Sequence, residues 1–405
     1  MTRLVLKFGG TSVADTGRIA SVASRIKQEW DAGHDLAVVV SAMAGETDRL
    51  IALAREIAPL SNGADYDAIV SSGEQVTAGL LALALEKLGV PARSWQGWQI
   101  PIYTDGVHGA ASVLSVEPAA IAEDFKQRRV AVVAGFQGIG PDGRITTLGR
   151  GGSDTTAVAL AAALKAERCD IYTDVDGIYT ADPRLVPQAA KLSQISYEQM
   201  LEMASLGAKV MQTRSVELAM VHGVRTQVRS TFTGAPGTLI CGEDEIVERK
   251  LVAGVAHSRD EAKISLLKVA DKPGVAAAIF GPLADAGINV DMIVQNVSED
   301  GRTIDLTFTV IKADFERALQ AIERCAAKIG YRKIVSDADI AKVSVIGHGI
   351  RTHAGVAQIL FKTLAEKNIH VQVISTSEIK VSVLIAAKYL ETAVRALHAA
   401  YGLGG

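Results

Sequence analysis

Cysteine is scarce in this chain of 405 residues. The three cysteines, Cys169, Cys241 and Cys325, are far apart and form no closely spaced pair. This spacing argues against the disulfide framework of a small secreted protein and against the paired ligands of a zinc ribbon. It suits a chain that works in a reducing cytoplasm.

Long apolar runs and a strong excess of one charge are lacking too. The N-terminal stretch MTRLVLKFGG has no long apolar core of a signal peptide, and no uninterrupted apolar stretch reaches the ~20 residues that span a bilayer. The formal net charge of −3 gives no general attraction to nucleic acid or to an anionic membrane. We therefore expect a soluble cytoplasmic protein with no nucleic-acid or membrane partner, in which local groups must hold any anionic ligand.

The first part of the chain alternates short β-branched runs with longer helical ones. The clearest expected strands are residues 3–8, 35–42, 128–136 and 169–175, and the clearest expected helices are residues 15–30, 72–89 and 153–166. This alternation predicts an α/β domain over residues 1–245, with a mostly parallel central sheet and helices on both faces. Ligands in such sheets bind where strands end and loops lead into helices.

An internal repeat follows a change of composition at residues 231–250, where Gly, Pro and charged residues gather. The stretch from Gly274 to Ile293 aligns without a gap on the stretch from Gly355 to Ile374. We expect two ferredoxin-like βαββαβ domains, over residues 260–335 and 340–405. The edges of such small sheets can pair with each other or with another chain.

The first candidate loop is LVLKFGGTSV. Lys7 stands at the end of a strand, and Gly9 and Gly10 follow it, so a tight turn can present backbone N–H groups beside an ammonium. This arrangement suits a phosphate or a transferring phosphoryl group, although the lysine precedes the glycines, unlike in a Walker loop. The alternative is a surface lysine followed by an ordinary turn.

Two further loops carry Ser41 with Thr47, and Glu74 after Gly73 at the start of a helix. Hydroxyls for a carboxylate and a carboxylate for an ammonium would suit a small zwitterion. Helix caps and turns are the alternative for all three side chains.

The Gly-rich stretch TTLGRGGSDTTA fits neither a Rossmann nor a Walker fingerprint, because it has Asp154 in place of a glycine and no lysine. Arg150 could face a phosphate, and the N–H groups of Gly151, Gly152 and Ser153 could converge at the start of a helix beginning near Thr155. Asp154 could instead be a simple helix-start carboxylate.

A fourth loop, YTDVDGIYTADPR, follows the strand at residues 169–175. It offers Asp174 for hydroxyl or base N–H groups, Tyr179 for a planar face and Arg184 for phosphate, so it predicts a nucleoside pocket. An ordinary polar loop is the alternative.

Together these loops resemble the aspartate kinases of the amino-acid kinase family, and the resemblance covers essentially the whole chain. The motifs that carry it are KFGGTS (7–12), SAM with Thr47 (41–47), SSGE (71–74), TTLGRGGSD (146–154), TDVDGIYTADPR (173–184) and GAKV (207–210). The repeated modules resemble the two ACT domains that follow the kinase domain in this family.

The resemblance implies transfer of a phosphoryl group from ATP to the side-chain carboxylate of L-aspartate, the first step toward lysine, threonine and methionine. ATP and Mg²⁺ are the implied cofactors, with no side chain assigned as a metal ligand. In the implied catalytic centre, Lys7 with the Gly9 and Gly10 N–H groups neutralises the phosphoryl group, and Asp154 orients cationic groups and water around Mg²⁺. The implied substrate residues are Ser41, Thr47, Glu74 (ammonium), Arg150 (α-carboxylate) and Ser153. The implied nucleotide residues are Lys7, Thr173, Asp174, Tyr179, Arg184 and Lys209.

The resemblance also implies that effector amino acids, lysine and threonine, bind between the ACT modules. The implied effector residues are Asp271, Gly274, Asn289, Val290, Gln295 and Asn296 in the first copy, and Ile369, Ser375, Thr376 and Glu378 in the second. The second copy departs from the usual pattern at Ile350 and at His370, which leaves its ligand affinity open.

Three alternatives stay open at this point. The acceptor could be glutamate or N-acetylglutamate, or the chain could be a catalytically silent amino-acid-binding regulator. A separate small subunit would need an internal start, yet no methionine occurs between Met220 and Met292. We expect one full-length chain in a homo-oligomer joined partly through ACT edges.

Overall fold

The computed structural model describes residues 2–206, 210–247, 250–298 and 301–404. They form two compact units, one of Met1–Ile178 with Lys191–Glu248 and one of Tyr179–Ala190 with Arg249–Gly405. The chain therefore crosses from the first unit to the second, returns, and crosses again. Lys209 of the predicted nucleotide site lies outside the described residues.

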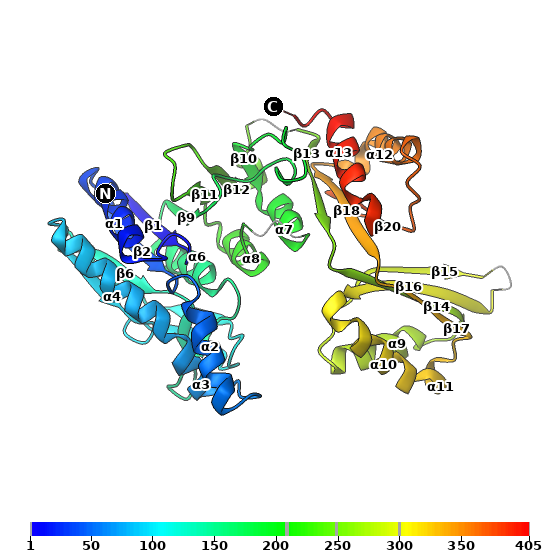
Figure 1. Ribbon diagram of the computed structural model, residues 1–405, viewed down its shortest axis with the longest axis horizontal. Helices are drawn as coiled ribbons and strands as arrows, with labels where there is room; N and C mark the ends of the chain where they lie inside the picture. The colour runs from blue at the N-terminus through cyan, green and yellow to red at the C-terminus, as the bar shows by residue number, and fades with distance from the viewer. Residues whose placement is uncertain (1, 207–209, 248–249, 299–300, 405) are drawn as a thin grey trace. The chain divides into compact units, whose positions relative to one another are not determined.

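The first unit is built on an eight-stranded sheet (Figure 1). Its strands in spatial order are β10 (Gln194–Ser196), β12 (Thr238–Cys241), β11 (Thr226–Ser230), β9 (Arg168–Thr173), β1 (Arg3–Phe8), β2 (Asp35–Val40), β6 (Val130–Ala134) and β3 (Ala92–Trp95). The strands from β11 to β3 pair in parallel, and β12 is antiparallel to β11. The predicted mostly parallel sheet is confirmed.

Helices cover both faces of this sheet. The helices of the first unit are α1 (Thr16–Asp31), α2 (Glu46–Ile57), α3 (Ala64–Val70), α4 (Ser72–Lys87), α5 (Ala119–Lys126), α6 (Gly152–Leu164), α7 (Tyr197–Ser205) and α8 (Thr213–His222), with a 3₁₀ turn at Glu243–Glu245, and of these α3 packs on β8 (Ile145–Thr147) of a second, smaller sheet. Side chains of α1 and α4 share one core with Leu4, Leu6 and Phe8 of β1. Because side chains alternate along a strand, Lys7 points to the other face, where α6 packs.

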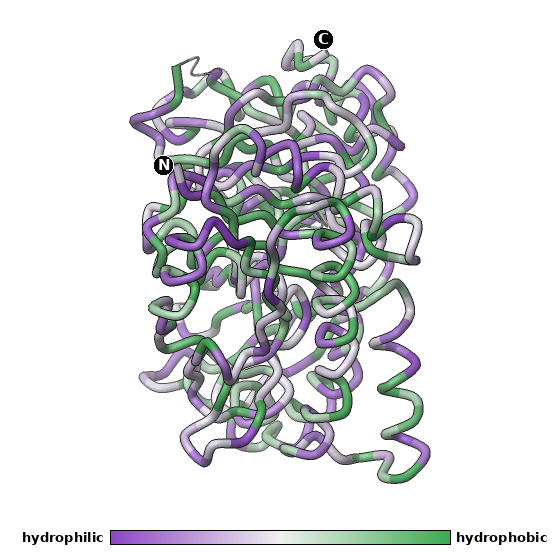
Figure 2. The backbone as a smooth tube through the Cα atoms, turned by 90° about the vertical axis from the view of Figure 1, so that its left-hand side faces the viewer, coloured by the Kyte–Doolittle hydropathy of each residue, from purple (hydrophilic) through white to green (hydrophobic). Residues whose placement is uncertain are grey.

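Sequence explains these helices locally. Asp15 caps α1 by accepting a hydrogen bond from the Arg18 N–H at 2.8 Å, and the buried side chains of α1 recur every three or four residues. Figure 2 shows such alternation of hydrophobic and hydrophilic residues along outer helices. Helix α6 is buried almost throughout, which its small alanine side chains permit.

A second, smaller sheet in the first unit was not anticipated from the sequence. Its order is β5 (Val113–Val116), β4 (Ile102–Thr104), β7 (Gln137–Ile139) and β8 (Ile145–Thr147). Three of these strands have only three residues, too few to show a two-residue alternation. Strand β8 leads directly into the Gly149–Gly151 loop.

The first repeat in the second unit has the expected βαββαβ order. It contains β14 (Glu261–Ala270), α9 (Val275–Asp285), β15 (Asp291–Val297), β16 (Thr303–Ile311), α10 (Phe315–Arg324), α11 (Ala326–Ile329) and β17 (Lys333–Asp337), with a 3₁₀ turn at Lys312–Asp314. Its strands are ordered β15-β16-β14-β17 and pair antiparallel. The ferredoxin-like prediction is confirmed for this copy.

The second repeat takes one strand from elsewhere in the chain. It contains β18 (Ile340–Gly347), α12 (Ala354–Glu366), β19 (Val373–Thr376), β20 (Lys380–Ala386) and α13 (Leu390–Ala400), with 3₁₀ turns at Ile350–Thr352 and Ala387–Tyr389. Its fourth strand is β13 (Val252–Ser258), which pairs antiparallel with β18. The predicted range 340–405 therefore omits the edge strand, because β13 precedes the first repeat in the chain.

The segment Tyr179–Ala190 also belongs to the second unit, although the predicted range 1–245 placed it in the first. Ala181 and Val186 lie in the core of the second repeat. Thr180 Oγ1 lies 2.9 Å from His398 Nε2 and donates to the Leu403 carbonyl at 3.1 Å. These contacts tie the segment to α13 and to the residues that follow it.

Lys342 of β18 links the two repeats. Its ammonium lies 2.9 Å from Glu261 Oε1 and 2.6 Å from Asp291 Oδ2, both from the first repeat. Burial alone would lower the pKa of Lys342, but the two carboxylates outweigh it and raise that pKa. Beside this cluster, Met292 shares an apolar contact group with Ile340 and Val373.

One helical run, Ala64–Lys87, is long and apolar enough to cross a membrane by length and composition. Half of its most apolar window is buried inside the protein. A core helix passes the same test, so this run is weak evidence for a membrane span.

The edge-strand arrangement predicts how fragments of the second unit behave. A fragment from Lys250 to the end contains β13, whereas one from Asp260 lacks it and loses the buried Val252 and Val255. At about 1.5 kcal/mol for each valine, the shorter fragment loses roughly 3 kcal/mol. We expect its thermal midpoint, followed by circular dichroism, to be lower by about 6–12 °C. Equal midpoints would contradict the assignment of β13.

Candidate functional site

The candidate site lies where the central strands of the first unit end. Because parallel strands end at the same edge, β1, β2 and β6 deliver Lys7, Ser41 and Phe136 to one place. The starts of α4 and α6 close the site with Glu74 and Asp154. Loops widely separated in sequence therefore meet at this edge.

Lys7 and Asp154 form a buried ion pair. Lys7 Nζ lies 2.6 Å from Asp154 Oδ1, and both side chains are about nine-tenths buried. Asp154 is in the first turn of α6, where the helix dipole favours a carboxylate. The pair keeps an ammonium inside the protein at a place that a charged ligand can reach.

Glu74 is a buried carboxylate with one free oxygen. Its Oε1 accepts a hydrogen bond from the Ala42 N–H at 3.1 Å, while Oε2 is buried without a hydrogen-bond partner among the described residues. Burial raises the pKa of Glu74 to about 7, against the opposing effect of the Ala42 N–H. An unpaired buried acceptor that lines a cavity fits a cationic ligand group.

The loop from Gly149 to Gly151 carries Arg150 into the site. Gly149 and Gly151 both have φ of +73°, a conformation that favours glycine. Helix α6 begins at Gly152 and not near Thr155, because the Gly152 N–H closes a turn onto the Gly149 carbonyl. That N–H is therefore not free to bind an anion, which differs from the prediction made from the sequence. The guanidinium of Arg150 has no ion-pair partner among the described residues.

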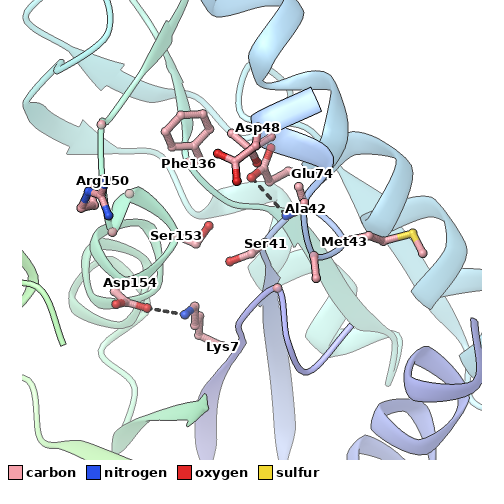
Figure 3. A pocket seen from close by; sticks show the side chains of 17 residues that line it. Lys7, Ser41, Ala42, Met43, Asp48, Glu74, Phe136, Arg150, Ser153 and Asp154 are labelled. Atoms are coloured by element: carbon pink, nitrogen blue, oxygen red, sulfur yellow. Dashed lines mark hydrogen bonds and ion pairs between the residues drawn. The ribbon is translucent and has the colours of Figure 1, made fainter. Parts of the chain in front are cut away.

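A cavity of about 330 Å³ joins these groups (Figure 3). Its lining includes these predicted residues: Lys7, Gly10, Ser41, Thr47, Glu74, Arg150, Ser153 and Asp154. In Figure 3, Lys7 and Asp154 lie at one end and Glu74 at the other, with Ser41 and Ser153 between them. The cavity thus has an ammonium at one end and an unpaired carboxylate oxygen at the other, which suits a ligand that carries both an anionic and a cationic group.

Sequence reasoning missed Asp48 and Phe136, which also line the cavity. Asp48 lies next to Thr47 in the first turn of α2, where an acid is common and gives no signal of a site. Phe136 has φ of +69°, which is rare for an aromatic residue and stores strain of order 1–3 kcal/mol. Its N–H donates to Thr156 Oγ1 at 3.1 Å, and its carbonyl accepts from the Leu148 N–H at 2.9 Å. No signal in the sequence indicates this conformation.

Gly9 differs from its predicted role. Its N–H donates to the Tyr172 carbonyl of β9 at 3.3 Å, and Gly9 is not part of the cavity lining. A Cβ atom there would lie 3.3 Å from Lys7 Nζ. The glycine therefore gives the lysine room, and its N–H is used within the sheet.

The predicted nucleotide residues lie in both units. Thr173 ends β9, its hydroxyl donates to Asp174 Oδ1 at 3.1 Å, and its carbonyl accepts from the Thr231 N–H at 2.9 Å. Tyr179 and Arg184 belong to the second unit, where Arg184 forms an exposed ion pair with Asp182 at 2.7 Å. Neither Thr173 nor Asp174 lines the cavity around Glu74.

Within the described ranges, no cluster of three or more His, Cys, Asp or Glu residues could hold a metal ion. Mg²⁺ commonly binds proteins through one or two carboxylates plus substrate phosphates. Asp154 is a carboxylate beside the candidate phosphoryl position, so this residue set fits a metal brought in by a phosphate ligand.

The predicted effector residues lie at two equivalent places in the repeats. In the first repeat, Asp271 and Gly274 flank the turn before α9, Asn289 and Val290 precede β15, and Gln295 and Asn296 lie on it. In the second, Ile369 precedes β19, Ser375 and Thr376 lie on it, and Glu378 follows. Ile369 is buried, whereas Glu378 forms an exposed ion pair with Arg351 at 2.6 Å.

Comparison with known proteins agrees with this architecture. Residues 2–230 match the amino acid kinase family, and residues 264–327 and 343–401 each match an ACT domain. An aspartate kinase of Pseudomonas putida is 54% identical over 404 residues, covering 100% of this chain and 98% of that protein. The chain therefore belongs to the amino acid kinase family, and within it to the aspartate kinases that carry two ACT domains.

Two solved structures of Escherichia coli aspartokinase III are similar over their whole length. The complex with aspartate and ADP, in the R-state, has a TM-score of 0.81 and 28% identity, covering 98% of this chain and 99% of that chain. The complex with lysine and aspartate, in the T-state, has a TM-score of 0.75 at the same identity, with 98% of each chain covered.

The raised pKa of Glu74 predicts a stability effect with a definite sign. Between the usual pKa of 4.5 and about 7, the folded protein binds a proton that the unfolded chain has lost, so stability falls as pH rises through this window. Above pH 7 the loss is roughly 3 kcal/mol. We expect Glu74→Gln to raise the thermal midpoint at pH 8 and to leave it unchanged at pH 4.

Glu86→Gln is the matched control, because Glu86 is exposed near the other end of α4. It should change neither midpoint. A Glu74→Gln variant that melts no higher than the parent protein at pH 8 would show that the buried charge carries no such penalty.

Proposed function

We propose that this chain transfers the γ-phosphoryl group of ATP to the side-chain carboxylate of L-aspartate, giving 4-phospho-L-aspartate and ADP. One observation carries the proposal: a single cavity has the unpaired oxygen of Glu74 at one end and the Lys7 ammonium at the other. The kinship with aspartate kinases, one of which was solved with aspartate and ADP, supports it.

In the proposed substrate complex, the α-ammonium of aspartate binds Glu74 Oε2. The α-carboxylate of aspartate binds Arg150, whose guanidinium has no ion-pair partner among the described residues. Hydroxyl groups complete the pocket. The proposed hydroxyl donors are Ser41, Thr47 and Ser153. Ionised Glu74 is the form that pairs with an ammonium, so bound substrate should lower the pKa that burial raises.

The chemical step needs no general base. A carboxylate with a reference pKa of ~3.9 is already ionised at neutral pH. One of its oxygens forms a bond to the γ-phosphorus while the bond from that phosphorus to the β,γ-bridging oxygen breaks, and ADP leaves with the electron pair. The task of the site is to bring two anions together, and Lys7 neutralises charge on the transferring group. Asp154 holds the Lys7 ammonium in position.

For the nucleotide we propose Thr173 and Asp174 of the first unit, while Tyr179 and Arg184 of the second unit and Lys209 stay predictions from the sequence. Thr173 ends β9, the neighbour of β1, and Asp174 follows it, which supports a nucleotide approaching Lys7 from that side. Mg²⁺ bound to the phosphates would neutralise part of their charge.

We further propose that lysine and threonine regulate the enzyme by binding between the two ACT repeats. The residues ahead of β15 and β19 flank an apolar contact between the repeats, which supports an effector site there. Escherichia coli aspartokinase III was solved with lysine. Product feedback of this kind suits the first step toward lysine, threonine and methionine. A full-length homo-oligomer joined partly through ACT edges, in a reducing cytoplasm where the three free cysteines persist, completes the proposal.

The decisive experiment measures ADP release with ATP and Mg²⁺ against aspartate, glutamate and N-acetylglutamate in turn. We expect turnover with aspartate and at most background with the other two. ADP release that prefers another acceptor would overturn the substrate assignment, and no release with any acceptor would favour a silent regulator. The same assay with lysine and threonine, alone and together, should show inhibition; no effect of either would overturn the effector proposal.

Lys7→Ala should lower kcat by about 10²–10³-fold with little change in the KM for aspartate, since its charge matters most in the transition state. Lys27→Ala is the control, because Lys27 forms a more exposed ion pair with Asp31 on α1. Steady-state kinetics measures both variants. Near-normal kcat for Lys7→Ala would refute the role of Lys7. Because this change leaves Asp154 buried and unpaired, a Lys7→Met/Asp154→Asn variant separates lost stability from lost catalysis.

A further inference from the structure

Asp67 of α3 is a fully buried carboxylate outside the cavity lining. Its Oδ1 accepts from the Thr147 hydroxyl at 2.6 Å and its Oδ2 from the Thr147 N–H at 3.1 Å. The Gly109 N–H lies 3.2 Å from both oxygens, and His108 Nδ1 lies 2.7 Å from Oδ2. Burying a carboxylate is unfavourable unless donors surround it, so this arrangement is a specific, fully satisfied anchor.

The anchor holds the end of β8. Thr147 is the last residue of that strand, and its carbonyl accepts from the Ala111 N–H at 2.9 Å. Arg214 of α8 adds a second clamp, donating to the Leu148 carbonyl at 3.1 Å and to the Ala111 carbonyl at 2.5 Å. Groups from α3, α8 and the residue 108–111 loop thus fix the backbone of Thr147 and Leu148.

This fixed backbone ends two residues before Arg150. Gly149, between them, has φ of +73°, and a Cβ there would lie 3.1 Å from the Gly109 carbonyl oxygen, so the loop has little freedom on that side. Arg150 is exposed and has no ion-pair partner among the residues that the structure describes. Because no described residue pairs with its guanidinium, the backbone before Arg150 is what limits the positions that its side chain can reach.

We infer that Asp67 is a positioning residue for substrate binding, acting through Thr147 and the Gly149–Gly151 loop to set the place of Arg150. The inference rests on the proposed function, in which Arg150 binds the α-carboxylate of aspartate. Displacements of about 1 Å in a positioning group can lower rates by roughly 10²-fold, so a remote anchor of this kind affects the substrate that its loop contacts.

Asp67→Asn tests the anchor. The Asn side chain puts an NH₂ group against N–H and O–H donors, so one of these contacts must open. We expect the KM for aspartate to rise about tenfold, while the KM for ATP changes less than twofold. Asp65→Asn is the matched control on the same helix, because the exposed Asp65 forms an ion pair with Arg144 at the protein surface; both of its KM values should match the parent protein.

A double-variant comparison separates positioning from a general structural role. If Asp67 acts through Arg150, then Asp67→Asn should add less than twofold to the KM for aspartate in an Arg150→Ala background. The inference would be overturned if the two substitutions raised the KM for aspartate independently, so that their fold-changes multiplied in the double variant. Equal rises in the KM for aspartate and the KM for ATP in Asp67→Asn alone would overturn it too.

If Asp67→Asn does not fold, Thr147 decides the question. Thr147→Ser keeps the hydroxyl that donates to Asp67 and should keep the parent KM for aspartate. Thr147→Val removes this hydroxyl and should raise the KM for aspartate without raising the KM for ATP. Equal KM values for these two variants would refute the anchor. Loss of aspartate-dependent turnover in the parent protein would instead refute the proposed function, so the two failures are distinguishable.

Discussion

The structure of the whole catalytic unit depends on the buried ion pair of Lys7 and Asp154. Withdrawing two charges from water is unfavourable by several kcal/mol for each ion, and a single contact at 2.6 Å only partly compensates. Such a pair persists only in a rigid frame. The frame is the central strand β1, flanked by β2 and β9 in register, with α6 packed on one face and α1 and α4 on the other.

Other unfavourable features gather around the same edge of the sheet. Glu74 carries an unpaired oxygen, and Phe136 holds a left-handed backbone conformation. Each lowers stability in the absence of a ligand, and each lines the cavity. The large apolar core beneath them allows the protein to keep these unfavourable groups in the absence of a ligand.

Local sequence patterns predicted much of this site but little of its long-range support. The sequence shows a lysine at a strand end followed by glycines, and an acid at a helix start. These two patterns were sufficient to predict that Lys7 and Glu74 lie at one edge of the sheet. Three-residue strands carry no periodicity, so the small sheet was missed. Asp67 resembled any acid in a short helix, because its partners are tens of residues away in the chain. The origin of the fourth strand of the second ACT repeat was equally hidden, since only tertiary pairing shows it.

That fourth strand makes the first ACT repeat an insertion within the second. β13 ends at Ser258, but its partner β18 is complete only at Gly347, about 90 residues later. At synthesis rates of ~5–20 residues per second, β13 waits roughly 5–18 s for β18, while its other edge faces Thr180, whose carbonyl accepts from the Val255 N–H at 2.8 Å. The first repeat can close its own sheet during that interval and carries β13 along as a tether. The order of synthesis therefore allows the first ACT repeat to fold before the second repeat can complete its sheet.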